Sequence, residues 1–454
     1  MCVRFSPDGQ FLASSGGDKL AFLYELPSGN VLAKIEHHNS YVATCAFSRS
    51  AKRLATGSND KQIVLWKLNP PDTNCTDIQS TTATTSEEQL TRESSVTSTD
   101  NDGENEIEFS HASILSEKDD ISMMERISTA HDSDINDLVF INEKEFVSVS
   151  SDKSLRLWSL EACQIQQMKT IEVHKNPMYS ICTNGNPTSK LVTTALDGSI
   201  GLWDLPSLEL SKPLFKSESS HLEFENASPK GIRVCRSSND GQKLITAGDD
   251  DGANVWCMES GECENRLFNG GHSNTVFVAC FIGDDGSLAV TGCNDGYLKV
   301  WNVKKETVLH TIEEAHDLGV VCGATKPKGE RMLDDSYTTL VTGGNDTIIR
   351  IWKVFEEVTK LGTIELVQEL NGHGSTIMSI SFSPKTGKYF ASTSGDKTVR
   401  IWNSNSFVCL KVLDGRSNRF RTTIFKLFGV ETHLGTNHAF LHFRSYSLCI
   451  VLYF

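Results

Sequence analysis

The 454-residue sequence contains no Cys-x-x-Cys pair, no secretory signal and no apolar run long enough to cross a bilayer. Its 13 cysteines are an odd number scattered along the chain. That pattern argues against a disulfide framework and against a zinc site built from paired cysteines. We therefore expect a soluble intracellular protein, cytoplasmic or nuclear, with no membrane segment and no metal.

The sequence also lacks the short motifs that carry common catalytic chemistry. There is no phosphate-binding P-loop, no Gly-x-Ser-x-Gly nucleophile turn and no His-Glu-x-x-His zinc helix. We therefore expect a protein that is not an enzyme and binds no cofactor.

The excess of acidic residues is concentrated in one segment. The formal net charge is -15, but residues 67–126 hold 14 acidic and 4 basic residues and so account for -10 of it. The rest of the chain is nearly neutral. Nucleic-acid binding would call for a clustered basic face, so we do not expect a nucleic-acid ligand.

What the sequence does contain is a repeat, clearest from Gly372 to Asn403, which predicts three short strands separated by tight turns. The repeat ends in an aromatic residue, and these ends use all seven tryptophans of the chain plus one tyrosine: Tyr24, Trp66, Trp158, Trp203, Trp256, Trp301, Trp352 and Trp402. Six residues before each lies an aspartate: Asp18, Asp60, Asp152, Asp197, Asp250, Asp295, Asp346 and Asp396. Four residues before each aspartate lies a hydroxyl: Ser14, Thr56, Ser148, Thr193, Thr246, Thr291, Thr342 and Ser392. Eight coincidences at fixed offsets predict one supersecondary unit per copy.

This pattern resembles the WD40 repeat, which has a Gly-His near its start and a Trp-Asp at its end. The resemblance implies an all-β protein, a WD40 β-propeller with eight recognisable repeats. Three arrangements stay open: seven blades, eight blades in one ring, or parts of two rings.

In the WD40 family a buried hydrogen-bonded chain runs from Trp through Ser or Thr and His to Asp and ties together the inner strands of a blade. An unpaired buried polar group costs about 1–3 kcal/mol, so these residues are expected to be structural. The resemblance places complete sets at six repeats: His38, Thr56, Asp60, Trp66; His131, Ser148, Asp152, Trp158; His174, Thr193, Asp197, Trp203; His272, Thr291, Asp295, Trp301; His316, Thr342, Asp346, Trp352; and His373, Ser392, Asp396, Trp402.

The fifth repeat departs from this pattern. Ser228 stands near the expected histidine, and Ser237 stands where the family usually has Phe. We expect its blade to be the loosest.

The repeats are interrupted once and stop before the end. We expect two repeats in residues 1–68, the first incomplete because its Gly-His corner is missing, and six repeats in residues 127–413. Residues 69–126 are acidic and rich in Ser and Thr, a composition that predicts a disordered linker. Residues 414–454 contain no repeat, and we interpret them as a non-repeat tail of aberrant sequence.

A repeat protein without catalytic motifs is best interpreted as a protein–protein interaction scaffold. Within the family the segments Tyr41–Phe47 and Ala315–Gly319 look like the repeat region of WD, SAM and U-box proteins, which are ubiquitin ligases. Target recognition within a ubiquitin ligase, of that type or as a cullin receptor, is therefore the alternative. It implies ubiquitination machinery as a partner. Side chains just after the Gly-His corners are the candidate protein-binding residues: Tyr41, Asp134, Tyr179 and Phe277.

Overall fold

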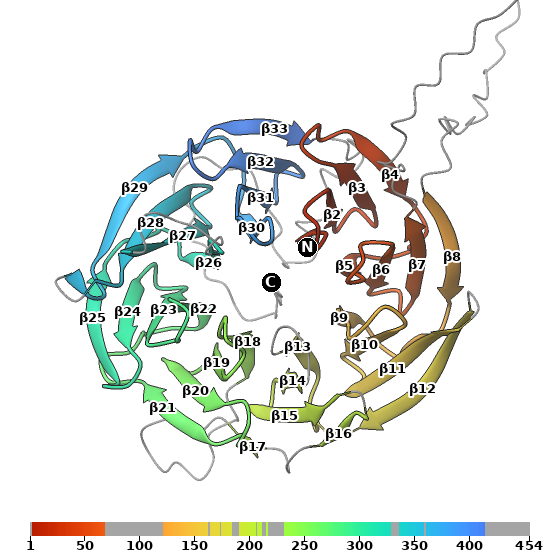
Figure 1. Cartoon of the computed structure of the whole chain (residues 1–454), viewed down its shortest axis with the longest axis horizontal. Helices are drawn as coiled ribbons and strands as arrows, with labels where there is room; N and C mark the ends of the chain where they lie inside the picture. The colour runs from red at the N-terminus through yellow and green to blue at the C-terminus, as the bar shows by residue number, and fades with distance from the viewer. Residues whose placement is uncertain are drawn as a thin grey trace, which may run out of the picture. The chain divides into compact units, whose positions relative to one another are not determined.

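A computed structural model of the chain shows eight antiparallel sheets arranged as the blades of a ring (Figure 1). It describes residues 2–68, 121–161, 164–172, 174–183, 190–205, 207–210, 215–216, 231–327, 336–357 and 360–413. The expected all-β propeller is confirmed, and of the three arrangements left open by the sequence the structure shows eight blades. Within the described residues no helix is long and apolar enough to span a membrane.

Blades are numbered here in chain order, and each begins with its innermost strand. The first four blades contain these strands: β1 (Cys2–Phe5), β2 (Phe11–Ser15), β3 (Ala21–Glu25) and β4 (Val31–Ile35); β5 (Val42–Phe47), β6 (Arg53–Ser58), β7 (Ile63–Leu68) and β8 (Ile121–Ile127); β9 (Ile135–Phe140), β10 (Glu145–Ser150), β11 (Ser154–Glu161) and β12 (Gln164–Glu172); β13 (Met178–Thr183), β14 (Lys190–Ala195), β15 (Ser199–Asp204), β16 (Glu209–Leu210) and β17 (Phe215–Lys216).

The last four blades have four strands each: β18 (Ile232–Ser237), β19 (Lys243–Gly248), β20 (Ala253–Cys257) and β21 (Cys263–Leu267); β22 (Val276–Ile282), β23 (Leu288–Cys293), β24 (Leu298–Asn302) and β25 (Thr307–Ile312); β26 (Val320–Thr325), β27 (Tyr337–Gly344), β28 (Ile349–Phe355) and β29 (Ile364–Leu370); β30 (Ile377–Phe382), β31 (Tyr389–Ser394), β32 (Val399–Asn403) and β33 (Cys409–Leu413).

The core lies between neighbouring blades, because each sheet buries one face against the preceding sheet and the other face against the following sheet. Ile63 of blade 2 shares one buried cluster with Phe146 and Trp158 of blade 3. Trp301 of blade 6 packs with Val255 and Leu267 of blade 5. Apolar burial between repeats is what holds together a fold of this kind.

The second blade contains a strand that sequence analysis placed in the linker. β8 pairs with β7 over its whole length, from Ile63 opposite Ile127 to Leu68 opposite Ile121. The expected boundary at residue 126 therefore falls inside a strand, and residues 121–127 complete blade 2. The remainder of the expected linker, residues 69–120, lies outside the described residues, as does the expected tail, residues 414–454.

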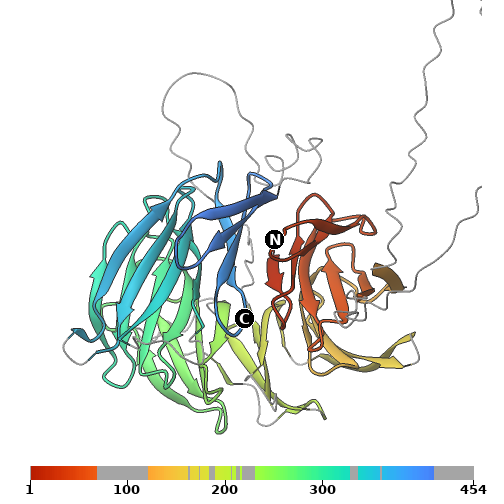
Figure 2. The same ribbon diagram turned by 45° about the horizontal axis from the view of Figure 1, so that its top comes forward.

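All eight sheets belong to one ring, so the alternatives of seven blades and of two partial rings are wrong. Blades 1 and 8 meet through a shared buried cluster in which Val3 and Tyr24 of blade 1 pack with Ala391 and Ile401 of blade 8. Figure 2 shows β33 beside the first blade. The first repeat, expected to be incomplete because its Gly-His corner is missing, still supplies all four strands of its sheet, β1–β4. What it lacks is the histidine.

Candidate functional site

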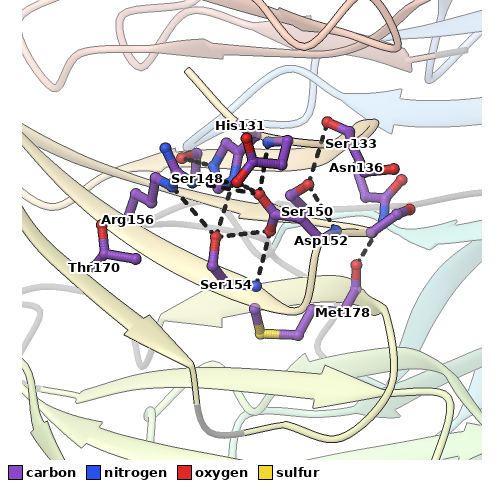
Figure 3. Close-up of polar contacts among 12 residues, drawn as sticks. His131, Ser133, Asn136, Ser148, Ser150, Asp152, Ser154, Arg156, Thr170 and Met178 are labelled. Atoms are coloured by element: carbon purple, nitrogen blue, oxygen red, sulfur yellow. Dashed lines mark hydrogen bonds and ion pairs between the residues drawn. The ribbon is translucent and has the colours of Figure 1, made fainter. Parts of the chain in front are cut away.

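The hydrogen-bonded chain expected within each blade is complete in blade 3, and Figure 3 shows its members His131, Ser148 and Asp152. Trp158 Nε1 donates to Ser148 Oγ at 2.8 Å, and His131 Nε2 lies 2.6 Å from the same oxygen. His131 Nδ1 lies 2.8 Å from an Asp152 carboxylate oxygen and 3.1 Å from Ser154 Oγ. The chain crosses from the blade's first corner to the turn between β10 and β11.

The proton positions in this chain follow from its acceptors. A carboxylate can only accept, so the proton lies on His131 Nδ1, and Nε2 accepts from the Ser148 hydroxyl. Burial lowers the pKa of His131 and outweighs the nearby Asp152 charge, so the imidazole stays neutral. The pKa of Asp152 is lowered, because bonds from His131, Ser154 and a backbone N–H outweigh the opposing effect of burial.

Blades 7 and 8 repeat this arrangement. The distances from His Nε2 to the hydroxyl are 2.9 and 2.8 Å, and those from Nδ1 to the carboxylate are 2.9 and 2.8 Å. The residues are His316, Thr342, Asp346 and Trp352 in blade 7 and His373, Ser392, Asp396 and Trp402 in blade 8. In blade 7 Arg350 adds a bond of 2.6 Å to Asp346.

The other three expected sets are each altered at one link. In blade 2 His38 bonds Thr56 and Asp60, but Trp66 Nε1 has no partner among the described residues. The Trp66 ring instead meets His37 edge-on, with 5.1 Å between centroids. The expected set in this blade is therefore three residues long.

In blade 4 the chain is indirect. His174 Nδ1 lies 2.6 Å from Ser199 Oγ, which in turn bonds Asp197. At the other end Trp203 Nε1 donates to Thr193 Oγ1 at 3.0 Å, and His174 Nε2 lies 2.8 Å from that oxygen. Sequence analysis missed Ser199, although a hydroxyl two residues after the aspartate recurs at Ser154 and Thr398.

In blade 6 the link between histidine and aspartate is open. Thr291 Oγ1 lies 2.7 Å from both His272 Nε2 and Trp301 Nε1. His272 Nδ1, however, lies 3.5 Å from the Asp295 carboxylate and makes no hydrogen bond.

Blades 1 and 5 keep only part of the chain. In blade 5 Trp256 Nε1 donates to Thr246 Oγ1 at 2.8 Å, while Ser228 lies outside the described residues. Ser237 Oγ donates to the Thr183 carbonyl of blade 4 at 3.0 Å, so the unexpected polar residue has a partner across the blade boundary. In blade 1 Tyr24 stacks with Phe22 in place of the tryptophan.

A second set of equivalent residues marks the start of the inner strands. In blades 2–8 the second residue of the inner strand is a β-bulge, skipped in the pairing with the next strand. We call this set the bulge ring: Ala43, Asn136, Tyr179, Arg233, Phe277, Val321 and Met378. The inner strands surround the axis of the propeller (Figure 1). Because each bulge is the second residue of its inner strand and these strands occupy equivalent places in their blades, the bulge ring lies toward one end of the axis.

The four candidate binding residues fall at two positions relative to this ring. Tyr179 and Phe277 belong to it, and both are partly exposed. Tyr41 and Asp134 come just before β5 and β9, and their carbonyls accept backbone N–H groups of the turn that follows the second strand. Burial raises the pKa of Asp134 against the opposing charge of Lys61.

Sequence reasoning missed the bulge-ring residue between the two aromatics. Arg233 of blade 5 donates to Asp249 through Nε at 2.6 Å and through a terminal nitrogen at 3.2 Å. Thr275 of blade 6 donates to the same carboxylate at 3.3 Å. Arg233 therefore occupies the bulge position of blade 5, and Tyr179 and Phe277 occupy the equivalent positions of the two neighbouring blades. In the sequence, the position of Arg233 two residues after Gly231 was the feature that could have identified it.

The family comparison agrees with the blade pattern. The model described as "WD domain, G-beta repeat" matches residues 1–25, 29–67, 124–159, 165–204, 261–302 and 364–403. These ranges correspond to the inner three strands of blades 1–4, 6 and 8, and each range after the first begins at the outer strand of the preceding blade. The chain therefore carries WD40 repeats, arranged as an eight-bladed β-propeller.

Curated relatives are similar at low identity. The transcriptional corepressor LEUNIG_HOMOLOG of Arabidopsis thaliana is 22% identical over 73% of this chain and 35% of its own length. THO complex subunit 3 of Arabidopsis thaliana is 23% identical over 56% of this chain and 72% of its own. The protein transport protein sec13 of Aspergillus fumigatus is 29% identical over 40% of this chain and 61% of its own. The chain thus spans about a third of the corepressor and under two thirds of the sec13 protein.

Among solved structures, the computationally designed Ika8 protein matches with a TM-score of 0.59 and 17% identity. The match covers 88% of this chain and 95% of the designed chain. At this identity the likeness concerns the fold alone.

Proposed function

We propose that the protein is a non-catalytic scaffold that binds another protein at the bulge ring. The WD40 propeller fits a protein-interaction role. The observation that carries the proposal is the arc formed by Tyr179, Arg233 and Phe277 on three consecutive blades. A bulge re-aims a side chain out of the regular pleat, and aromatic residues and arginine dominate binding energy at protein interfaces.

The arc supplies its side chains in a fixed arrangement. Arg233 is oriented by two bonds to Asp249, and its side chain is 18% exposed. Its neighbours on the ring are partly exposed aromatics, which lose little conformational entropy on binding. A partner could place apolar groups against Tyr179 and Phe277 and carbonyl groups against the guanidinium of Arg233.

Proximity labelling in cells tests the proposal. The chain would be compared with a Tyr179→Ala/Phe277→Ala variant and with a control, Leu366→Ala/Val367→Ala, whose exposed side chains lie on the outer strand β29. We expect a defined set of proteins labelled by the wild type and the control to be lost from the bulge-ring variant. Equal labelling by all three chains contradicts binding at the bulge ring.

Target recognition for a ubiquitin ligase is the second candidate. It rests on the resemblance of Tyr41–Phe47 and Ala315–Gly319 to proteins that join WD repeats to SAM and U-box domains. The same labelling experiment addresses it, because ubiquitin-conjugating proteins among the lost set favour this function and an unrelated complex favours the plain scaffold. Recovery of the lost set from nuclear or cytoplasmic fractions would likewise test the expected location.

A further inference from the structure

One histidine of the WD40 chains, His272, differs from the other five in making no hydrogen bond through Nδ1, although an Asp295 carboxylate oxygen lies 3.5 Å away. In blades 2, 3, 7 and 8 the Nδ1 atom lies 2.8–3.1 Å from an aspartate, and in blade 4 it lies 2.6 Å from Ser199. His272 Nδ1 has no hydrogen bond, although the side chain is completely buried. Leaving a buried polar atom without a hydrogen bond lowers stability, so its persistence calls for an explanation.

The side chains around His272 are of the types that bind metal ions. His272 Nδ1, Cys293 Sγ and an Asp295 carboxylate oxygen all lie within 4.8 Å of one another. They come from two places in blade 6: His272 precedes β22, while Cys293 ends β23 and Asp295 lies in the turn after it. Cysteine, histidine and aspartate are the ligand types of zinc.

We propose that these three residues form a binding site for Zn²⁺ or a similar thiophilic divalent cation. The separation of 3.5 Å between Nδ1 and the carboxylate is too long for the hydrogen bond found in the other blades. It matches the edge of a tetrahedron whose arms are about 2.0–2.3 Å, the usual zinc–ligand distances. A water molecule would complete the four-coordinate shell.

The surroundings fit this ligand set. With Nδ1 bound to the metal, Nε2 carries the proton and donates to Thr291 Oγ1 at 2.7 Å, which fixes the ring as a partner of a metal-bound histidine usually does. Asp295 is held by the backbone N–H groups of Ser273 and Tyr297 at 3.1 and 3.0 Å. The buried thiol of Cys293 donates to the Asn274 carbonyl at 3.0 Å, so metal binding replaces this bond, and the thiol proton passes to solvent.

No competing cation or hydroxyl takes up the Nδ1 atom in blade 6. The position of Arg350 in blade 7 is held here by Lys299, whose Nζ donates to the Gly270 carbonyl at 2.5 Å. The position of Ser154 in blade 3, whose hydroxyl bonds histidine, is held by Tyr297. Blade 6 alone therefore combines an open histidine with a cysteine.

The chain offers a variant that separates metal binding from folding. Serine stands in place of Cys293 in blades 2, 3 and 8, as Ser58, Ser150 and Ser394. Each of these serines accepts the N–H of the following aspartate at 3.0–3.1 Å, as Cys293 does at 3.4 Å. Cys293→Ser should therefore fold normally. Cys257→Ser, at a partly exposed cysteine elsewhere, is the matched control.

The test is titration of the full-length reduced protein with Zn²⁺ and with Co²⁺, followed by equilibrium dialysis and absorbance. We expect one metal per chain and a thiolate-to-cobalt charge-transfer band in the wild type and in Cys257→Ser. Binding should weaken at least about 100-fold in Cys293→Ser, because loss of a ligand costs no less than loss of an outer-shell partner. Zinc should also raise the melting temperature of the wild type but not of Cys293→Ser.

Two results would overturn the proposal. One is the absence of a thiolate-to-cobalt band in the wild type, in which case His272 is satisfied by water alone. The other is an equal band in wild type and Cys293→Ser, which would place the metal at other cysteines.

Discussion

Each indole N–H contributes to stability according to whether it has a partner. Trp301 is fully buried and donates to Thr291 at 2.7 Å, whereas the Nε1 atom of the buried Trp66 donates to nothing described. Trp301→Phe should therefore lower the free energy of unfolding by about 1–3 kcal/mol more than Trp66→Phe does, since both lose similar packing and only one loses a hydrogen bond. Urea unfolding of the two variants measures the difference. Equal losses would contradict the assigned chain in blade 6.

Buried histidines should make the fold sensitive to mild acid. Burial lowers the pKa of His174 from 6.5 to about 4 despite the nearby Asp197. The folded state thus disfavours the protonated ring, so this stability is complete above pH 6.5 and is lost as the pH falls toward 4, by up to about 3 kcal/mol. Measured unfolding free energies between pH 7.5 and 4, about the range in which histidine titrates, should fall less steeply in His174→Gln. An unchanged slope would show that His174 is protonated equally in both states.

Aspartates of the same chains add a second, more acidic transition. The pKa of Asp346 is lowered from 3.8 to about 2, because bonds from His316 and Arg350 outweigh the effect of burial. A depressed carboxyl pKa stabilises the fold above the unfolded value and loses that effect as the pH falls toward 2. Asp346→Asn should reduce the loss of unfolding free energy between pH 4.5 and 2.5, about the range of carboxyl titration. Leu318→Ala, at an exposed side chain near the same turn, is the control that should leave it unchanged.

The residues of the hydrogen-bonded chains were largely predictable, but their individual links were not. Fixed offsets identify Trp, Ser or Thr, and Asp, because each occupies one register position in a hairpin. Whether the histidine Nδ1 contacts the aspartate, a neighbouring hydroxyl such as Ser199 or neither depends on side-chain orientations that no sequence offset encodes. The missing hydrogen bond at His272 Nδ1 and the position of the Cys293 sulfur beside it could likewise not be predicted from the sequence.

Among the strands, β8 tests how the long insertion is accommodated. It pairs with β7 so that Leu68 and Ile121, the residues flanking the insertion, lie opposite each other. Replacing residues 70–119 with a short Gly-Ser turn should therefore leave the melting temperature unchanged, since a tight hairpin can join these ends.

A longer deletion provides the contrast. Removing residues 70–127 also removes Met124 and Ile127, which pack against the cluster between blades 2 and 3. We expect this deletion to cost about 2 kcal/mol or more of unfolding free energy. If the two deletions melt alike, β8 contributes nothing to blade 2.

Sequence reasoning predicted three strands in each repeat and did not predict β8, for a physical reason. The inner three strands of each blade are bound by the hydroxyl, aspartate and tryptophan offsets, whereas outer strands carry no such residue. β8 (Ile121–Ile127) also directly follows a long acidic segment. Its few apolar residues were therefore assigned to the linker on the basis of the composition of the preceding residues. The bulge ring could be predicted only in part. Tyr179 and Phe277 are recognisable in the sequence as aromatic residues, but the bulge that makes Arg233 equivalent to them is a feature of strand pairing between β18 and β19.

For the whole molecule, the central claim is that the eight blades form one closed ring that can present the bulge ring as a single surface. Closure depends on packing between blades 1 and 8, with no described strand exchanged between them. At the outer edge Lys411 of β33 donates through Nζ to the carbonyl of Ser28 at 2.5 Å. These two residues are distant in sequence and come together only if the ring closes.

The most direct test places a photo-crosslinking phenylalanine derivative at Ser28 and maps its products in the monomer fraction by mass spectrometry. A closed ring predicts an intramolecular crosslink to the segment around Lys411. Crosslinks found only in dimers, or none to β33, would contradict a closed eight-bladed ring.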